Sequence, residues 1–175
     1  IFGLAFALQV FIMGLAAILF GALSDKYGSG IAVISGTILF ILGLIWFANV
    51  QSSFDIIASQ ALVGFGSSGS GASVVLGAVG RTAKKENRSF YLGVVMAGAS
   101  LGQFVILPIT STLINYFEWS SSLIYLSIIA GSILIFAFAL NFSGKSQTSK
   151  IGTNQTAKEA LSEAFKNRSF FLLTL

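Results

Sequence analysis

The sequence contains no cysteine, no histidine and a single proline, and charged residues are scarce. Without cysteine or histidine, these residues cannot form disulfides, thiolate metal sites, imidazole metal ligands or imidazole proton relays. Only 9% of the residues are charged, whereas a soluble domain carries roughly 25%. Because 55% of the residues are hydrophobic, the composition also excludes an ordinary soluble domain. No catalytic residue, metal site or cofactor is predicted.

Five long hydrophobic runs make up most of the chain, and none of them contains Asp, Glu, Lys or Arg. Each has about the ~20 apolar residues needed to cross a ~30 Å hydrocarbon core. Backbone amides cannot stay unpaired in lipid, and the alternating pattern of a membrane barrel is absent, so each run is predicted to be a helix. The expected fold class is therefore all-α integral membrane, with five transmembrane helices. The runs are Ile1–Leu23, Ile31–Ala48, Ile56–Val79, Phe90–Phe117 and Ser121–Phe142.

All ten Lys and Arg residues lie in three of the segments that flank these runs. Cytoplasmic loops retain Lys and Arg, whereas translocated loops lack them. Loops 24–30, 80–89 and 143–168 are therefore predicted to be cytoplasmic, with Arg81 and Arg88 as anchors at the membrane surface. The pattern predicts a multi-pass protein of the cytoplasmic (inner) membrane, with the lipid bilayer as its partner. It also explains the net charge of +4, so no nucleic-acid binding is expected.

The chain begins without Met inside a hydrophobic run and ends at Phe170–Leu175, where another run starts. We expect a piece of a longer membrane protein, with residues 169–175 opening the next transmembrane helix. Residues 143–168 have the composition of a flexible linker. Within it, Ala157–Lys166 has helical spacing of apolar residues and is predicted to lie on the membrane surface. A regulatory or partner-binding role for that helix is the alternative.

The loop after the first run carries the sharpest motif, Gly21-Ala-Leu-Ser-Asp25-Lys26-Tyr-Gly28. Gly21 is expected to let two helices approach closely, and Gly28 to allow a tight turn that other residues would resist. Asp25 lies at a helix boundary, where its carboxylate can accept backbone amides or meet the positive N-terminus of a neighbouring helix. A well-capped turn is the plain interpretation of this pattern.

The third run is rich in glycine and serine. Its segment Gly64–Gly69 matches the letters of a dinucleotide-binding fingerprint, but that motif needs a strand–turn–helix unit, and this segment lies inside a predicted span. Gln60, Gly64, Ser67 and Gly71 fall on one helical face. Two interpretations stay open for this face. In the first, the glycines serve close helix packing or act as a hinge; in the second, the face forms the wall of a substrate cavity.

The fourth run contains a second set of candidates. Gly98 and Gly102 form a small-xxx-small pattern that favours helix contact, and Pro108 can kink the helix. Gln103 is a polar amide in an apolar helix, which indicates either an interhelical hydrogen bond or a binding site. The strongest cavity candidates are therefore Gln60, Ser67 and Gln103, followed by Ser70 and Ser100.

The Gly21–Gly28 loop resembles the signature loop between the second and third helices of major facilitator superfamily transporters. The match covers Gly21, Leu23, Asp25, Lys26 and Gly28, whereas Ser29 and Gly30 stand where the family often has Arg or Lys. The resemblance implies that Asp25 belongs to a conformational latch with the other half of the transporter. It also implies that Gln60 replaces an Arg that is common in the family and is associated with proton coupling.

The fourth run is similar to the fifth helix of the monocarboxylate-transporter-like branch, which includes oxalate/formate-antiporter-like proteins. The similarity rests on Arg88, Gly93, the run Ala97–Gln103, Pro108 and Trp119. Gln103 stands where drug antiporters have a Pro. The resemblance implies that residues 1–142 form helices two to six of the N-terminal half of a 12-helix, two-bundle transporter. The first helix and the C-terminal half would then lie outside this sequence.

These resemblances imply a secondary active transporter that moves a small, monocarboxylate-like organic anion by alternating access. Coupling to a proton or an anion would use charged groups outside this stretch, because the runs contain none. An exporter of drugs or other small solutes is the alternative within the superfamily. A membrane enzyme, which needs a nucleophile, an acid–base pair or a metal set at one depth, is disfavoured because the runs contain no Cys, His or carboxylate. A non-transporting helical membrane subunit is also disfavoured, because it would not need both the Asp25 loop and the helix with Gly102, Gln103 and Pro108.

Overall fold

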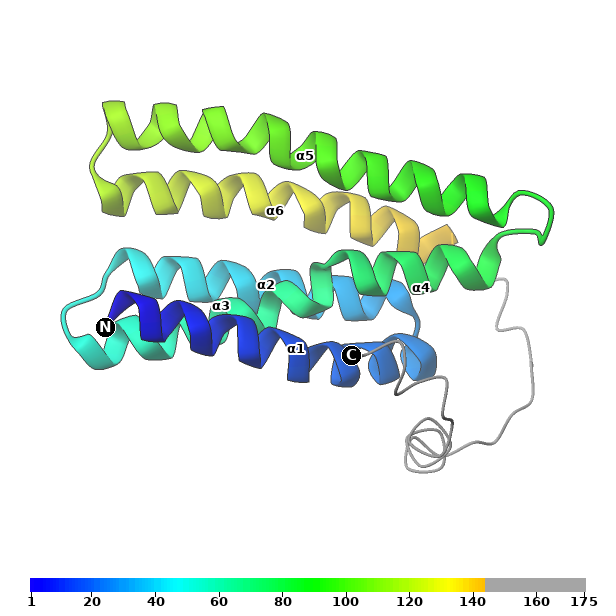
Figure 1. Cartoon of the computed structure of the whole chain (residues 1–175), viewed down its shortest axis with the longest axis horizontal. Helices are drawn as coiled ribbons and strands as arrows, with labels where there is room; N and C mark the ends of the chain where they lie inside the picture. The colour runs from blue at the N-terminus through cyan, green and yellow to red at the C-terminus, as the bar shows by residue number, and fades with distance from the viewer. Residues whose placement is uncertain (144–175) are drawn as a thin grey trace. The chain divides into compact units, whose positions relative to one another are not determined.

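The computed structural model describes residues 1–143, which lie within one compact unit, Ile1–Lys145. Within these residues the chain is helical throughout, which confirms the predicted all-α fold (Figure 1). The predictions for residues 144–168 and 169–175, including the surface helix at Ala157–Lys166, lie outside the described residues. The helices are α1 (Phe2–Tyr27), α2 (Ser29–Ala48), α3 (Ser53–Ser70), α4 (Ala72–Thr82), α5 (Arg88–Tyr116) and α6 (Trp119–Ser143).

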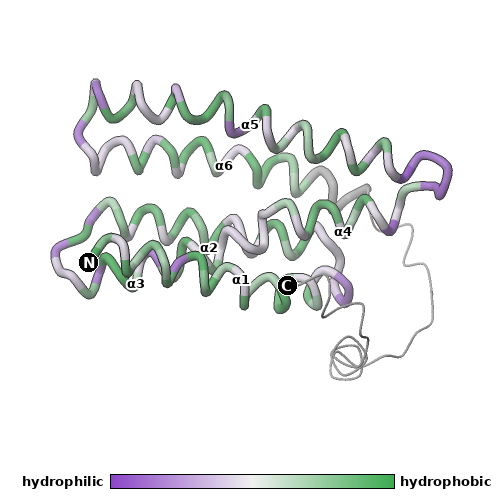
Figure 2. Tube along the Cα trace, in the orientation of Figure 1, coloured by the Kyte–Doolittle hydropathy of each residue, from purple (hydrophilic) through white to green (hydrophobic). Residues whose placement is uncertain are grey.

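In the described part of the chain, five segments are long and apolar enough to cross a membrane, as the hydrophobic runs predict. Four of them are single helices. The third, Ser53–Thr82, is interrupted at Gly71, which separates α3 from α4. Figure 2 shows hydrophobic residues along the helices and hydrophilic residues in the connections between them.

Consecutive spans run in opposite directions, so the connections gather at two ends of the bundle (Figure 1). At one end, Arg81 of α4 contacts Asp25 of α1. At the other end, the Ser120 hydroxyl of α6 donates to the Ala48 carbonyl of α2 at 2.5 Å. The two connections that contain no basic residue therefore lie at the same end, which is the grouping that the charge pattern predicts.

The hydrophobic core lies around α2, which packs against α3 and α6, while α3 also packs against α1. Two clusters of buried side chains fill these contacts. One joins α2, α3 and α6 and contains Leu44, Phe47, Ala48, Val63 and Leu123. The other joins α1, α2 and α4 and contains Ala16, Phe20, Ala32 and Val74.

The helix α3 is held between α1 and α2 by contacts that leave no room for side chains. A Cβ placed on Gly36 of α2 would lie 2.5 Å from the Gly69 Cα, and one on Gly66 would collide with the Phe40 amide nitrogen. On the other side, a Cβ on Gly64 would collide with the Gln9 carbonyl of α1. Small residues of this kind let helix backbones approach closely in membranes.

Polar groups add two further constraints on α3. The Ser68 hydroxyl donates to the Met13 carbonyl of α1 at 2.5 Å, which ties the two helices together inside the bundle. At the start of α3, the Ser52 hydroxyl accepts from the Asp55 amide, and the Asp55 carboxylate accepts from the Ser52 amide. This capping box satisfies amides that would otherwise lack partners and fixes where the helix begins.

Replacing Gly66 by Ala is expected to destabilise the protein, because the added methyl group must push α2 and α3 apart. Overpacking of this kind costs about 1–3 kcal/mol. The measurement is the thermal denaturation temperature of the purified full-length protein in mild detergent. Gly131→Ala on α6 is the matched control, since nothing lies within 4 Å of its Cβ. Equal denaturation temperatures for the two variants would contradict the close α2–α3 contact.

Candidate functional site

The turn between α1 and α2 depends on Gly28. Its backbone has φ +97° and ψ 150°, a region that essentially only glycine occupies. The tight turn expected at this glycine is therefore present. Gly21 differs from its expectation: nothing lies within 4 Å of a Cβ placed on it, so no close helix approach occurs there among the described residues. Lys26 lies beside the turn with its ammonium 5.1 Å from the centroid of the Tyr27 ring.

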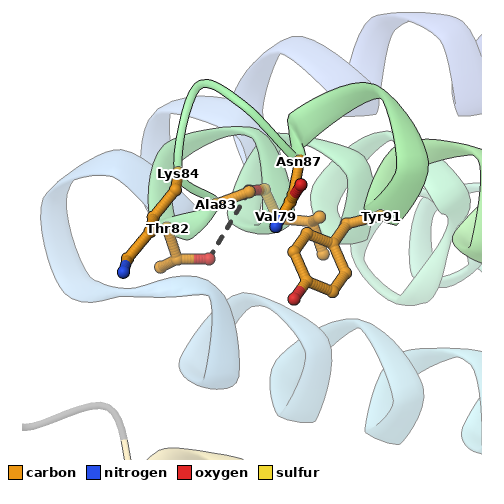
Figure 3. A pocket seen from close by; sticks show the side chains of 6 residues that line it. All are labelled: Val79, Thr82, Ala83, Lys84, Asn87 and Tyr91. Carbon is orange, nitrogen blue, oxygen red and sulfur yellow. Dashed lines mark hydrogen bonds between the residues drawn. The ribbon is translucent and has the colours of Figure 1, made fainter.

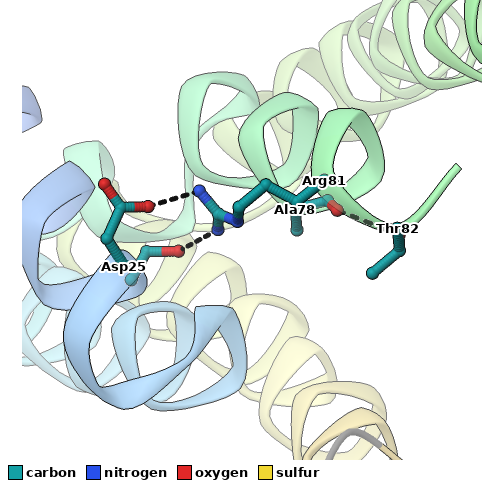
Figure 4. A network of polar contacts seen from close by, with 5 residues as sticks. Asp25, Ala78, Arg81 and Thr82 are labelled. Atoms are coloured by element: carbon teal, nitrogen blue, oxygen red, sulfur yellow. Dashed lines mark hydrogen bonds and ion pairs between the residues drawn. The ribbon is translucent and has the colours of Figure 1, made fainter. Parts of the chain in front are cut away.

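Arg81, at the end of α4, binds the last turn of α1 through two bonds (Figure 4). Its Nη1 atom lies 2.5 Å from Oδ1 of Asp25, and its Nη2 atom donates to the Ser24 hydroxyl at 2.8 Å. The Ser24 side chain is buried, whereas those of Arg81 and Asp25 are 47% and 66% exposed. An ion pair this exposed contributes at most about 1 kcal/mol, so its main effect is to fix where α4 ends against α1.

Sequence reasoning named Asp25 as a latch and Arg81 as a membrane anchor, but it did not pair them. The available signal was that both residues flank spans on the same predicted side and carry opposite charges. Arg88, the second predicted anchor, lies at the start of α5, where its guanidinium approaches Gly80 of α4. The contact with a second transporter half that the resemblance implies for Asp25 stays a prediction.

The break at Gly71 lies within a span, 11 residues before its basic end. Gly71 is extended, with φ −75° and ψ 170°, and α4 starts directly after it without a side-chain cap. As at any helix start, the first amides of α4, those of Ala72, Ser73 and Val74, have no acceptor within their own helix. The last carbonyls of α3 are released in the same way. The break therefore exposes polar backbone inside a hydrophobic span.

The predicted polar face of the third run divides into two parts. Gly64 is buried against α1, and the Ser67 hydroxyl donates to the Gly64 carbonyl at 2.9 Å, so these residues take part in packing and local bonding. Gln60 is half-buried, and its side-chain amide makes no hydrogen bond to any residue in the described range. Of the three, Gln60 keeps donors and an acceptor available for a solute.

The helix α5 holds the other sequence candidates, and none of its residues is buried. Gln103 is exposed and makes no hydrogen bond within residues 1–143. Nothing lies within 4 Å of a Cβ placed on Gly98 or Gly102, so the helix contact expected from their spacing has no partner in this part of the chain. The helix also continues through Pro108, whose carbonyl accepts from the Thr112 hydroxyl at 2.8 Å.

Five apolar spans in alternating directions define a multi-pass helical membrane protein. A comparison with protein families matches residues 1–175 to the model of the Major Facilitator Superfamily. The chain therefore belongs to the major facilitator superfamily, a family of secondary transporters of small solutes that is generally non-enzymatic. A search of curated proteins found no match to the sequence.

The contact between Asp25 and Arg81 predicts a small but measurable coupling. In a double-mutant cycle of Asp25→Asn and Arg81→Gln, each single variant should lose the interaction, and the double variant should lose little more. The expected coupling is up to about 1 kcal/mol because both side chains are partly solvated. Thermal denaturation of the full-length protein at low salt provides the measurement. Lys85→Gln replaces Arg81→Gln in the control cycle. Additive effects in the first cycle, like those expected in the control, would argue against the contact.

Proposed function

We propose that the protein is a secondary active transporter of small organic anions in the cytoplasmic membrane, working by alternating access. The observation that carries this proposal is the break in a membrane span at Gly71. Backbone that leaves the helix at membrane depth persists only where protein buries it or where it faces a water-filled cavity. Discontinuous helices that expose backbone groups in this way form the binding sites of many transporters.

The polar groups near the break favour an anionic solute. The unpaired amides at the start of α4 are donors, and a helix N-terminus carries a partial positive charge. Gln60, on the same span, adds a side-chain amide that can donate to a carboxylate. Because the five hydrophobic runs supply donors but contain no Asp, Glu, Lys or Arg, proton or anion coupling in this proposal uses residues outside this stretch. Gln103, where drug antiporters have a Pro, also supports an organic anion over a drug.

The packing also supports a division of motion within the third span. The helix α3 is fixed between α1 and α2 through Gly64, Gly66 and Gly69. The shorter α4 is joined to α3 at Gly71 and is bonded at its far end to the end of α1 through Arg81. In the proposal, α3 stays with the bundle during transport, while α4 bends at Gly71 as the Asp25 latch forms and releases.

The test is solute flux into proteoliposomes that contain the full-length protein. Labelled small monocarboxylates and dicarboxylates are offered under a proton gradient and, separately, against a preloaded anion. The proposal expects saturable uptake of at least one carboxylate and competition by its analogues, with Gln60→Leu raising the half-saturation concentration. Transport of lipophilic cations without carboxylate uptake would favour the exporter alternative. No flux of either class would overturn the assignment to organic anions.

Gly71→Ala is expected to slow transport with little loss of stability. Alanine favours a continuous helix by about 1 kcal/mol over glycine, and in the broken geometry its Cβ would lie 2.8 Å from the Ser67 carbonyl oxygen. Maximal flux should fall about tenfold, which corresponds to about 1.4 kcal/mol on the transport barrier. Gly93→Ala on α5, whose Cβ meets nothing within 4 Å, serves as the control. Unchanged flux in Gly71→Ala would exclude Gly71 as a hinge.

A further inference from the structure

A pocket lies between the end of α4 and the start of α5, at the predicted cytoplasmic end of the bundle (Figure 3). Its volume is about 460 Å³. The lining residues are Val79, Thr82, Ala83, Lys84, Asn87 and Tyr91. Its lining includes neither Gly71, where the span is broken, nor Asp25 and Arg81, and the transport proposal uses none of its residues.

The segment beside the pocket is strongly basic. Residues 81–88 contain Arg81, Lys84, Lys85 and Arg88, with Glu86 as the only acid. Arg81 is engaged by Asp25, which makes the only ion pair among residues 1–143. Lys84 and Lys85 are both exposed, but only Lys84 lines the pocket. Its ammonium group has no anionic partner in the described part of the chain, so it can neutralise an anion bound there.

The polar donors of the pocket match the oxygens of a phosphate. Neither the Asn87 side-chain amide, which directly precedes α5, nor the Tyr91 hydroxyl makes a hydrogen bond within residues 1–143. Thr82 is less available because its hydroxyl donates to the Ala78 carbonyl at 2.9 Å. An ammonium, an amide and a phenol together supply several donors for one anionic group.

The other side of the pocket is apolar. Val79 and the ring of Tyr91 belong to the ends of two membrane spans, and Ala83 directly follows the first of them, so this surface lies where acyl chains meet headgroups. Basic pockets between transmembrane helices on the cytoplasmic side suit anionic lipid headgroups. A soluble phosphate would use the donors but would gain nothing from the apolar surface.

We propose that this pocket binds an anionic phospholipid of the phosphatidylglycerol class. The phosphate lies against Lys84, Asn87 and Tyr91, and the glycerol backbone lies over Val79 and Ala83. Bound in this way, the lipid bridges α4 and α5, which pack against each other and are joined only by the short basic loop. The lipid would thus support α5, which has no buried residue in the described part of the chain.

Native mass spectrometry of the full-length protein in detergent tests this site, with phosphatidylglycerol, phosphatidylcholine or inorganic phosphate added. Lys84→Gln and Lys85→Gln are a matched pair, because both remove one positive charge from adjacent exposed positions and only Lys84 lines the pocket. We expect Lys84→Gln to reduce retention of phosphatidylglycerol about fivefold, the effect of one lysine at a membrane surface. Lys85→Gln should retain it like the unmodified protein, and Tyr91→Phe should show a smaller loss.

Three results would overturn the proposal. Equal losses in Lys84→Gln and Lys85→Gln would show diffuse attraction to the basic loop and no defined pocket. Equal retention of phosphatidylcholine would show that the anionic charge is not recognised. Displacement of the lipid by millimolar inorganic phosphate would show a site for the free anion. Preferential retention of phosphatidylglycerol that is lost only in the pocket variants supports the site.

Discussion

The arrangement of the described helices depends on one contact, the close approach of α3 to the backbones of α1 and α2. Gly36, Gly64, Gly66 and Gly69 leave no space for a Cβ at these crossings, and the Ser68 hydroxyl bonds directly to the α1 backbone. Lipid provides no hydrophobic force between helices, so such backbone contacts and interhelical hydrogen bonds must hold them together. The two core clusters form on either side of this contact, and both include residues of α2.

The second half of the same span is held differently. Beyond Gly71, α4 contributes one buried residue, Val74, and its end is fixed by Arg81, which bonds to Ser24 and Asp25 at the end of α1. The ion pair with Asp25 is solvated and weak, whereas the α3 contacts are buried. A span with one rigid and one loosely held part, separated by unpaired backbone, suits a transporter that must open and close a path.

The sequence was sufficient to predict the helical class, the five spans and the two groups of connections, because length, hydropathy and charge determine them locally. It also indicated Gly28, whose turn needs positive φ. It did not predict the break at Gly71, because five glycines in one run give no sign of which one leaves the helix. Nor did it pair Asp25 with Arg81, which are 56 residues apart and meet only through the packing of α1 and α4.

Amide hydrogen exchange of the full-length protein, resolved to short peptides, tests most directly whether α3 is rigid and the span is broken at Gly71. The structure predicts slow exchange from Val63 to Ser70, where α3 is clamped, and fast exchange at Ala72 to Val74, whose amides lack a helical acceptor. The remainder of α4 should show intermediate exchange. Uniformly slow exchange from Ser53 to Thr82 would mean one continuous rigid helix and would contradict the account.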